Sequence, residues 1–227
     1  MKKALLSLAL LAGITSAAHA QSGTFKYGVK GGFSLSSYMG GGAGGGTTGY
    51  KPGFTAGALV NYGFTDNASI QVEGLYSQKG AFIDDYSTTS SGNKLQYRST
   101  LQYIDLPILF KYNIGQDGKG LFFELGPQAS FAVANREFTR ESGSGAGSGT
   151  EKDLTTSKDG LVPVGIGYLG GIGYQITSGL GIGVRFTGDF SNVYKDGYFA
   201  GFSNLPVNNN FRNGVFQFQA HYLFGGK

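Results

Sequence analysis

The strongest constraint on the fold is a two-residue alternation of apolar side chains with small or polar ones, which begins at Phe25 and recurs along the chain. A period of two places the two sets of side chains on opposite faces of a β-strand. The alternating segments cover residues 25–35, 54–64, 69–76, 104–112, 121–133, 162–174, 180–190 and 215–224. The sequence therefore predicts an all-β protein built from eight strands.

The lengths of these segments and of their connections indicate what kind of β protein this is. Roughly ten residues is the length that a tilted strand needs to cross a bilayer. Short turns at 65–67, 116–118 and 177–179 alternate with long loops at 36–51, 80–98, 135–160 and 191–212. This order is typical of outer-membrane barrels, which have tight periplasmic turns and long outer loops. We expect an eight-stranded antiparallel up-and-down transmembrane β-barrel, closed because an open sheet edge in lipid leaves backbone groups unpaired.

The composition excludes several other classes of protein. The 227 residues include 41 glycines, but also 18 phenylalanines and 14 tyrosines, which disordered chains lack. Glycine does not recur at every third position, so collagen is excluded. The absence of cysteine excludes a disulfide framework, thiol catalysis and thiolate metal sites.

The first twenty residues have the pattern of a secretory signal peptide. Lys2 and Lys3 precede an apolar stretch, and Ala18-His19-Ala20 is a small-x-small cleavage site. We therefore divide the chain into a signal peptide, 1–20, and a barrel domain, 21–227, and place the mature protein in the outer membrane of a Gram-negative bacterium. Loss of the two lysines lowers the net charge from +4 to about +2, so nucleic acid is not an expected partner.

The charged residues of the strands fall on the small or polar face, which we assign to the barrel lumen. A cation in mid-bilayer on the lipid face would cost about 2–4 kcal/mol. The luminal charges expected at similar heights are Lys30, Glu73, Asp105, Glu124 and Arg185. Because buried charges must be paired, we predict a salt-bridged plug in which Arg185 and Lys30 face the three carboxylates. Separate, water-bridged charges remain the alternative.

Two features of the fourth and fifth segments predict local irregularities. Pro107 and Pro127 lie nearly opposite each other across a turn, so we predict one shared interruption of the ladder. Leu101 and Tyr103 are apolar at positions where the rest of the fourth segment has its polar face. A β-bulge near these residues therefore remains a possibility.

Two motifs that could carry chemistry have simpler structural interpretations. Residues 165–170 match GxGxxG, but the alternation continues through Tyr174 and no helix follows, so we interpret these glycines as lining a narrow lumen. His221 is the only histidine outside the signal peptide, and we place it at the rim near the periplasmic end of the last strand. No catalytic residue, cofactor site or metal site is predicted.

The sequence resembles the PorT-like outer-membrane β-barrel family within the wider set of OmpA-like and OmpX-like eight-stranded barrels. The residues that carry this resemblance are the run 103–112 (YIDLPILFKY), Leu125-Gly126-Pro127 and the alternating residues of the last segment. The resemblance implies outer-membrane residence and insertion by the barrel-assembly machinery, and some members of the family are implicated in protein secretion. The assembly signal would be formed by Phe216, Phe218, Tyr222 and Phe224, although Gly225-Gly226-Lys227 follow here.

From these observations we predict a non-enzymatic integral outer-membrane protein whose scaffold, surface or envelope-interaction role is carried by four long outer loops. Their charges and aromatics, among them Arg136, Tyr194 and Phe211, are typical of binding loops on a rigid frame. One alternative is a narrow channel or hydrophobic-solute conduit, favoured by the glycines at 165–173 and 181–183. Another, from the family resemblance alone, is a component that assists protein secretion. Expected partners are outer-membrane lipid and lipopolysaccharide and the barrel-assembly machinery, and the protein is expected to be a monomer.

Overall fold

The computed structural model describes residues 23–40, 47–88, 94–115, 119–142, 152–155, 158–197 and 210–225. The predicted signal peptide, 1–20, and the predicted turn at 116–118 lie outside these residues. Across the described ranges, no helix is long and apolar enough to cross a membrane.

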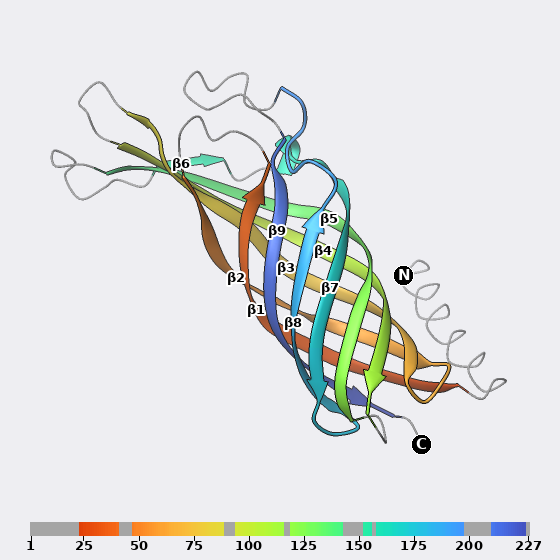
Figure 1. Cartoon of the computed structure of the whole chain (residues 1–227). Coiled ribbons are helices and arrows are strands. Elements are labelled where there is room, and N and C mark those ends of the chain that lie inside the picture. The colour runs from red at the N-terminus through yellow and green to blue at the C-terminus, as the bar shows by residue number, and fades with distance from the viewer. Residues whose placement is uncertain are drawn as a thin grey trace.

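Eight long antiparallel strands form a closed ring (Figure 1). They follow the order β1–β2–β3–β4–β5–β7–β8–β9, and β9 pairs with β1 to close the ring. The predicted eight-stranded up-and-down barrel is confirmed. The strands are β1 (Thr24–Met39), β2 (Thr47–Gly63), β3 (Ala68–Thr88), β4 (Lys94–Ile114), β5 (Gly120–Ser142), β7 (Val164–Gln175), β8 (Leu180–Asp189) and β9 (Arg212–Phe224), to which a short β6 (Lys152–Thr155) and a 3-10 turn η2 (Lys158–Gly160) are added.

The two faces of each strand lie as the alternation predicts. Apolar residues point outward, and Leu125 on β5 and Phe218 on β9 are 60% and 54% exposed. Aromatic pairs gather towards both ends of this outer surface, for example Tyr27 with Phe224 at the turn end, their ring centroids 5.7 Å apart. Phe186 and Phe216 form a similar pair nearer the loop end, at 4.9 Å. Two aromatic girdles with aliphatic residues between them are the exterior of a membrane barrel.

Three strands are much longer than the ten residues expected of them. β3, β4 and β5 contain 21, 21 and 23 residues and continue past the others at the loop end (Figure 1). The predicted long loop at 80–98 is therefore mostly a hairpin, since Thr88 pairs with Lys94. The predicted loop at 135–160 likewise begins as β5 and contains β6, which pairs with β5. The predicted turns at 65–67 and 177–179 are tight turns in the structure.

The predicted irregularity near Leu101 is present, but the extra residue lies on the neighbouring strand. The β4–β5 register shifts between Gln102 and Tyr103, which pair with Ala134 and Ala132 and leave Val133 unpaired on β5. β4 itself keeps one parity throughout, and its odd-numbered residues from Leu101 to Leu109 point inward and are buried. Leu101 and Tyr103 are apolar and point inward because this part of β4 lies beyond the lipid-facing region. At that end of the barrel the apolar side chains fill the interior.

The prediction of one shared interruption at the two prolines is wrong, because each proline lies at a separate gap. The β3–β4 ladder skips from Val72–Ile108 to Leu75–Asp105, and this gap contains Pro107. The β4–β5 ladder skips the positions at which Pro127 and Gly126 would face β4, and its register resumes unchanged. A proline has no N–H to donate, and successive residues of a strand face opposite neighbours. The two gaps therefore lie on opposite sides of β4.

Candidate functional site

Four charged side chains meet inside the barrel, and we call them the central ion network: Lys30, Glu73, Glu124 and Arg185. The guanidinium of Arg185 donates from Nη1 to Glu73 Oε2 at 2.8 Å and from Nη2 to Glu73 Oε1 at 3.0 Å. Its Nε donates to Glu124 Oε1 at 2.8 Å. The ammonium of Lys30 pairs with the same Glu73. With two cations and two carboxylates, the network is electrically neutral and almost completely buried.

Polar neighbours complete the network. Gln219 donates its side-chain amide to Glu124 Oε1 at 2.9 Å, and Gln71 donates to Glu73 Oε1 at 2.6 Å. A buried ion pair repays its desolvation cost only when the remaining lone pairs are also satisfied. These amides, from β9 and from β3 itself, supply that satisfaction, so the arrangement is one of fixed charges and not a flexible relay.

The network crosses the bore from one side to the other. Glu73 lies on β3 and Arg185 on β8, and these strands are four steps apart around the ring in either direction. Since eight strands enclose an interior just wide enough for side chains to fill, a side-chain bridge between opposite strands occupies the middle of the lumen.

Glycines on β7 make room for this crossing. Gly171 lies between Glu124 on β5 and Arg185 on β8 in the ladder. A Cβ there would lie 3.0 Å from Glu124 Oε1, and a Cβ at Gly173 would lie 2.3 Å from the ring of Phe122. The strand Val164–Gln175 is continuous, which confirms that the GxGxxG match is not followed by a helix. The space that the glycines leave is taken by Glu124 and Phe122, so it does not widen the lumen.

Asp105, expected in the same network, belongs instead to a second ion pair nearer the loop end. Lys79 Nζ lies 2.9 Å from Asp105 Oδ1 and also donates to Ser130 Oγ at 3.1 Å. Asp105 faces Leu75 on β3, one inward position beyond Glu73, and Lys79 on that strand reaches it. Lys79 was not predicted as a luminal charge because the third alternating segment ended at residue 76. Lys79 has the same inward parity as Glu73, and this was the signal that could have found it.

The loop end of the lumen is closed by apolar side chains, which we call the loop-end plug: Tyr38, Ala81, Ile83, Tyr97, Leu101, Tyr103, Leu161, Val193, Tyr194 and Phe211. Tyr194 comes from the segment after β8, and its hydroxyl lies 2.9 Å from that of Tyr38 and 3.1 Å from that of Tyr97. Tyr194 and Phe211 were expected to be exposed binding residues of a loop. They are 1% and 4% exposed, because both side chains pack into the loop-end plug.

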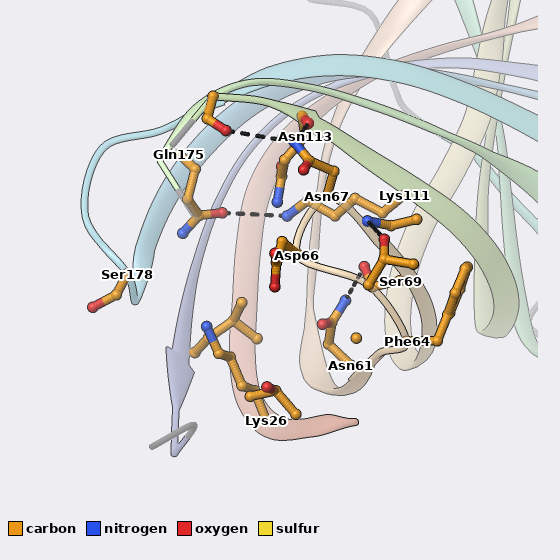
Figure 2. A pocket seen from close by; sticks show the side chains of 16 residues that line it. Lys26, Asn61, Phe64, Asp66, Asn67, Ser69, Lys111, Asn113, Gln175 and Ser178 are labelled. Atoms are coloured by element: carbon orange, nitrogen blue, oxygen red, sulfur yellow. Dashed lines mark hydrogen bonds between the residues drawn. The ribbon is translucent and has the colours of Figure 1, made fainter. Parts of the chain in front are cut away.

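The turn end of the lumen holds a polar cavity of about 730 Å³, which we call the turn-end vestibule (Figure 2). Lys111 is buried at its inner end, with Nζ 3.3 Å from Gln175 Oε1 and 3.9 Å from the centroid of the Phe122 ring. His221 is buried in the lumen and not at an open rim, with Nε2 3.0 Å from Gln175 Oε1 and 3.4 Å from Lys111 Nζ. Among the described residues, the hydrogen-bonding partners of its ring are thus an amide and an ammonium, and not a nucleophile.

The remaining predicted residues lie on the barrel wall. Pro107 points inward and Pro127 outward. The four aromatic residues of the predicted assembly signal, Phe216, Phe218, Tyr222 and Phe224, all lie on the outer face of β9. In the part of the chain that the structure describes, no group of three or more histidine or acidic side chains is arranged to hold a metal ion.

The protein family that matches this chain agrees with this architecture. A family model described as an outer membrane protein beta-barrel domain matches residues 19–195. No curated protein sequence matches the chain. Among solved structures, Neisserial surface protein A is 15% identical, with a TM-score of 0.40 over 90% of this chain and 100% of that one. The attachment invasion locus protein Ail of Yersinia pestis is 13% identical, with a TM-score of 0.41 over 88% and 99%. The outer membrane protein OprG from Pseudomonas aeruginosa is 13% identical, with a TM-score of 0.43 over 89% and 97%.

Proposed function

We propose that this chain, which belongs to the family of outer membrane protein β-barrel domains, is a non-conducting and non-enzymatic barrel that acts through its loop end. Membership of a family of outer membrane proteins supports a location in the Gram-negative outer membrane. The working surface would be the part of β3, β4 and β5 that continues past the lipid-facing belt.

The observation that carries this proposal is the side-chain bridge from Arg185 to Glu73 across the lumen, at 2.8 Å. Beyond it lie the Lys79–Asp105 pair and the loop-end plug. An ion or solute would have to separate buried opposite charges to pass, and breaking a buried pair costs about 3–5 kcal/mol. The glycines that favoured a channel in the sequence leave space that Phe122 and Glu124 occupy. These features support a scaffold or surface role over conduction.

Planar-bilayer recording on the purified full chain tests the non-conducting part of the proposal. We expect a silent bilayer with the native chain. A double variant, Glu73→Ala with Arg185→Ala, removes the bridge and is expected to raise the frequency of brief openings. Stable unitary conductance of the native chain would contradict the proposal and favour the channel.

The outer face of the strand extensions supports lipopolysaccharide as the partner at the loop end. Arg98 on β4 and Arg136 and Arg140 on β5 are exposed there, past Ile104, the last outward aliphatic residue of β4. Arg98 lies over the ring of Phe82 at 5.2 Å, and Arg136 over that of Phe138 at 4.6 Å. Guanidinium groups bind phosphate in a bidentate manner, and the outer leaflet presents lipid-linked phosphates at about this height.

Lipopolysaccharide binding can be measured with the folded protein in nanodiscs. The double variant Arg98→Gln with Arg136→Gln is expected to weaken binding about tenfold or more, since charge-assisted hydrogen bonds are lost. Lys158→Gln changes an exposed cation of η2 and serves as the control. Equal binding by the native chain and the double variant would exclude this surface.

We also propose that the aromatic residues on the outer face of β9 act as the signal for the barrel-assembly machinery, as the resemblance to PorT-like barrels implies. Phe224 stacks on Tyr27 across the β1–β9 seam, with ring centroids 5.7 Å apart. The variant Phe224→Ala should therefore insert more slowly with the purified machinery. The control Phe190→Ala, which changes an exposed aromatic residue just after β8 at the loop end, should insert as the native chain does. A role in protein secretion rests on that resemblance alone.

A further inference from the structure

The turn-end vestibule has the size of a ligand site. Its volume of about 730 Å³ lies within the range of small-molecule pockets, about 300–1,000 Å³. It is lined by the turn between β2 and β3 and by inward residues of β1, β2, β3, β4 and β7 (Figure 2). Thr65, Asp66 and Ser178 are exposed at its mouth, whereas Lys111 is buried at its inner end. The vestibule therefore opens at the turn end and stops within the lumen.

The charges that line the vestibule are mostly positive. Lys26 and Lys111 both line it, and Asp66, exposed in the turn, supplies the one carboxylate among the lining residues. The buried acids nearest in the lumen, Glu73 and Glu124, are already engaged by Arg185. Within the described residues, no carboxylate forms an ion pair with Lys26 or Lys111.

The contacts of Lys111 hold its ammonium in position without neutralising it. Its two polar contacts, to Gln175 Oε1 at 3.3 Å and to His221 Nε2 at 3.4 Å, are longer than ordinary hydrogen bonds. Its third contact is with the face of the Phe122 ring. All three partners are uncharged or cationic groups. A buried cation is favourable only when it is paired with an opposite charge, and the vestibule leaves room for one beside it.

The rest of the lining suits a polar, anionic ligand. Hydroxyls of Thr24, Thr65 and Ser69 and side-chain amides of Asn61 and Asn67 line the same cavity. Asn61 Nδ2 donates to Ser69 Oγ at 2.9 Å, which holds both groups in place on the wall. Such a lining does not suit an apolar solute.

We propose that the turn-end vestibule binds a small oxyanion, a carboxylate or phosphate group, with Lys111 Nζ at the inner end of the site and Lys26 on its wall. This site is separate from the loop-end surface and goes beyond the proposed function. Because the Arg185–Glu73 bridge closes the lumen above it, the vestibule is a binding pocket and not the entrance of a channel.

The proposal can be tested by titrating the folded full chain with inorganic phosphate and with succinate, and following the side-chain amides of Asn61, Asn67 and Asn113 by NMR. We expect saturable shifts of these three amides. In Lys111→Gln the affinity should fall about tenfold or more, since a charge-assisted hydrogen bond is lost. Lys119→Gln removes a cation at the same end of the barrel that does not line the vestibule, and it should bind as the native chain does.

Two further measurements keep the outcome decisive. Lys26→Gln, at a half-buried position on the wall, should also weaken binding, and it serves if Lys111→Gln does not fold. Nanodiscs of phosphatidylglycerol and of phosphatidylcholine, without added anion, distinguish a lipid headgroup from a free solute as the source of the oxyanion. Shifts that do not saturate, or equal affinity in the native chain and the lysine variants, would overturn the proposal.

Discussion

Arg185 and Glu73 lie on opposite sides of the barrel and are 112 residues apart in sequence, yet their side chains meet in a two-pronged ion pair at 2.8 and 3.0 Å. Arg185 also binds Glu124, so one guanidinium joins three strands. With Lys30, which pairs with Glu73, the central ion network is neutral as a whole, and its members depend on one another.

Replacing Arg185 with methionine should therefore destabilise the barrel strongly. The variant leaves two buried carboxylates with only Lys30 to balance them, and breaking a buried pair in this way costs about 3–5 kcal/mol. Urea-induced unfolding in lipid vesicles, followed by circular dichroism, measures the change in the free energy of unfolding. Arg98→Met, at an exposed position, is the control and should change that free energy by no more than about 0.5 kcal/mol. Similar free energies for the two variants would contradict the structural role of the network.

The two ion clusters should behave independently. A double-mutant cycle between Glu73→Gln and Arg185→Met should give a coupling energy of about 0.5–3 kcal/mol, because the two side chains share hydrogen bonds. The cycle between Asp105→Asn and Arg185→Met should be additive within about 0.5 kcal/mol, because Asp105 is paired with Lys79 instead. A strong coupling of Asp105 with Arg185 would restore the single network that the sequence predicted.

Gly173 should not accept a side chain. A Cβ there would lie 2.3 Å from the ring of Phe122 and 2.3 Å from the carbonyl oxygen of Ile182, so Gly173→Val should destabilise the barrel by about 1–3 kcal/mol through overpacking. Gly170→Val is the matched control on the same strand, since a Cβ at Gly170 has no atom within 4 Å. The second change Phe122→Leu should restore part of the loss. A Gly173→Val variant as stable as the control would show that the lumen has room to spare.

The loop-end plug should loosen at high pH. Tyr194 lies in the segment after β8, and burial, with Tyr38 and Tyr97 nearby, raises the pKa of its hydroxyl well above the ordinary 10.0. Stability from the neutral hydroxyl is complete below the ordinary pKa and is lost as the pH rises through the folded-state pKa. The tyrosinate absorbance of the native chain minus that of Tyr194→Phe should therefore titrate only well above pH 10.0. A difference that titrates at the ordinary pKa would place Tyr194 in water.

The faces of the strands could be predicted because lipid imposes a strict rule on them. Residues such as Glu124 and Arg185 can lie only on the inner face, so parity alone gives their direction. Parity also indicated that Arg185 would meet carboxylates. It named Glu73 and Glu124 among these carboxylates but could not separate Asp105 from them, because the height of each side chain depends on the stagger between strands that are not neighbours in the ring. Asp105 was assigned to the wrong cluster for this reason.

The strand extensions could not be predicted from the rule that lipid-facing side chains are apolar, because the extensions lie beyond the lipid. There the outer face becomes polar, as at Arg98, and the inner face becomes apolar, as at Leu101 and Tyr103. The two-residue alternation continues, but the apolar residues now lie on the inner face. In the sequence this change of face has the same pattern as a β-bulge. The proline gaps were misjudged for a related reason, since each depends on which neighbour the missing N–H would have faced.

The distance in sequence between Glu73 and Arg185 has a consequence for how the barrel inserts. Glu73 belongs to the third strand of the ring and Arg185 to the seventh, so neither charge can meet the other until the sheet has curled almost fully round. In a half-curled sheet Glu73 could pair with Lys30 on β1 and Arg185 with Glu124 on β5, but the bridge that unites these two pairs could not form. The full central ion network is thus completed only as the ring closes.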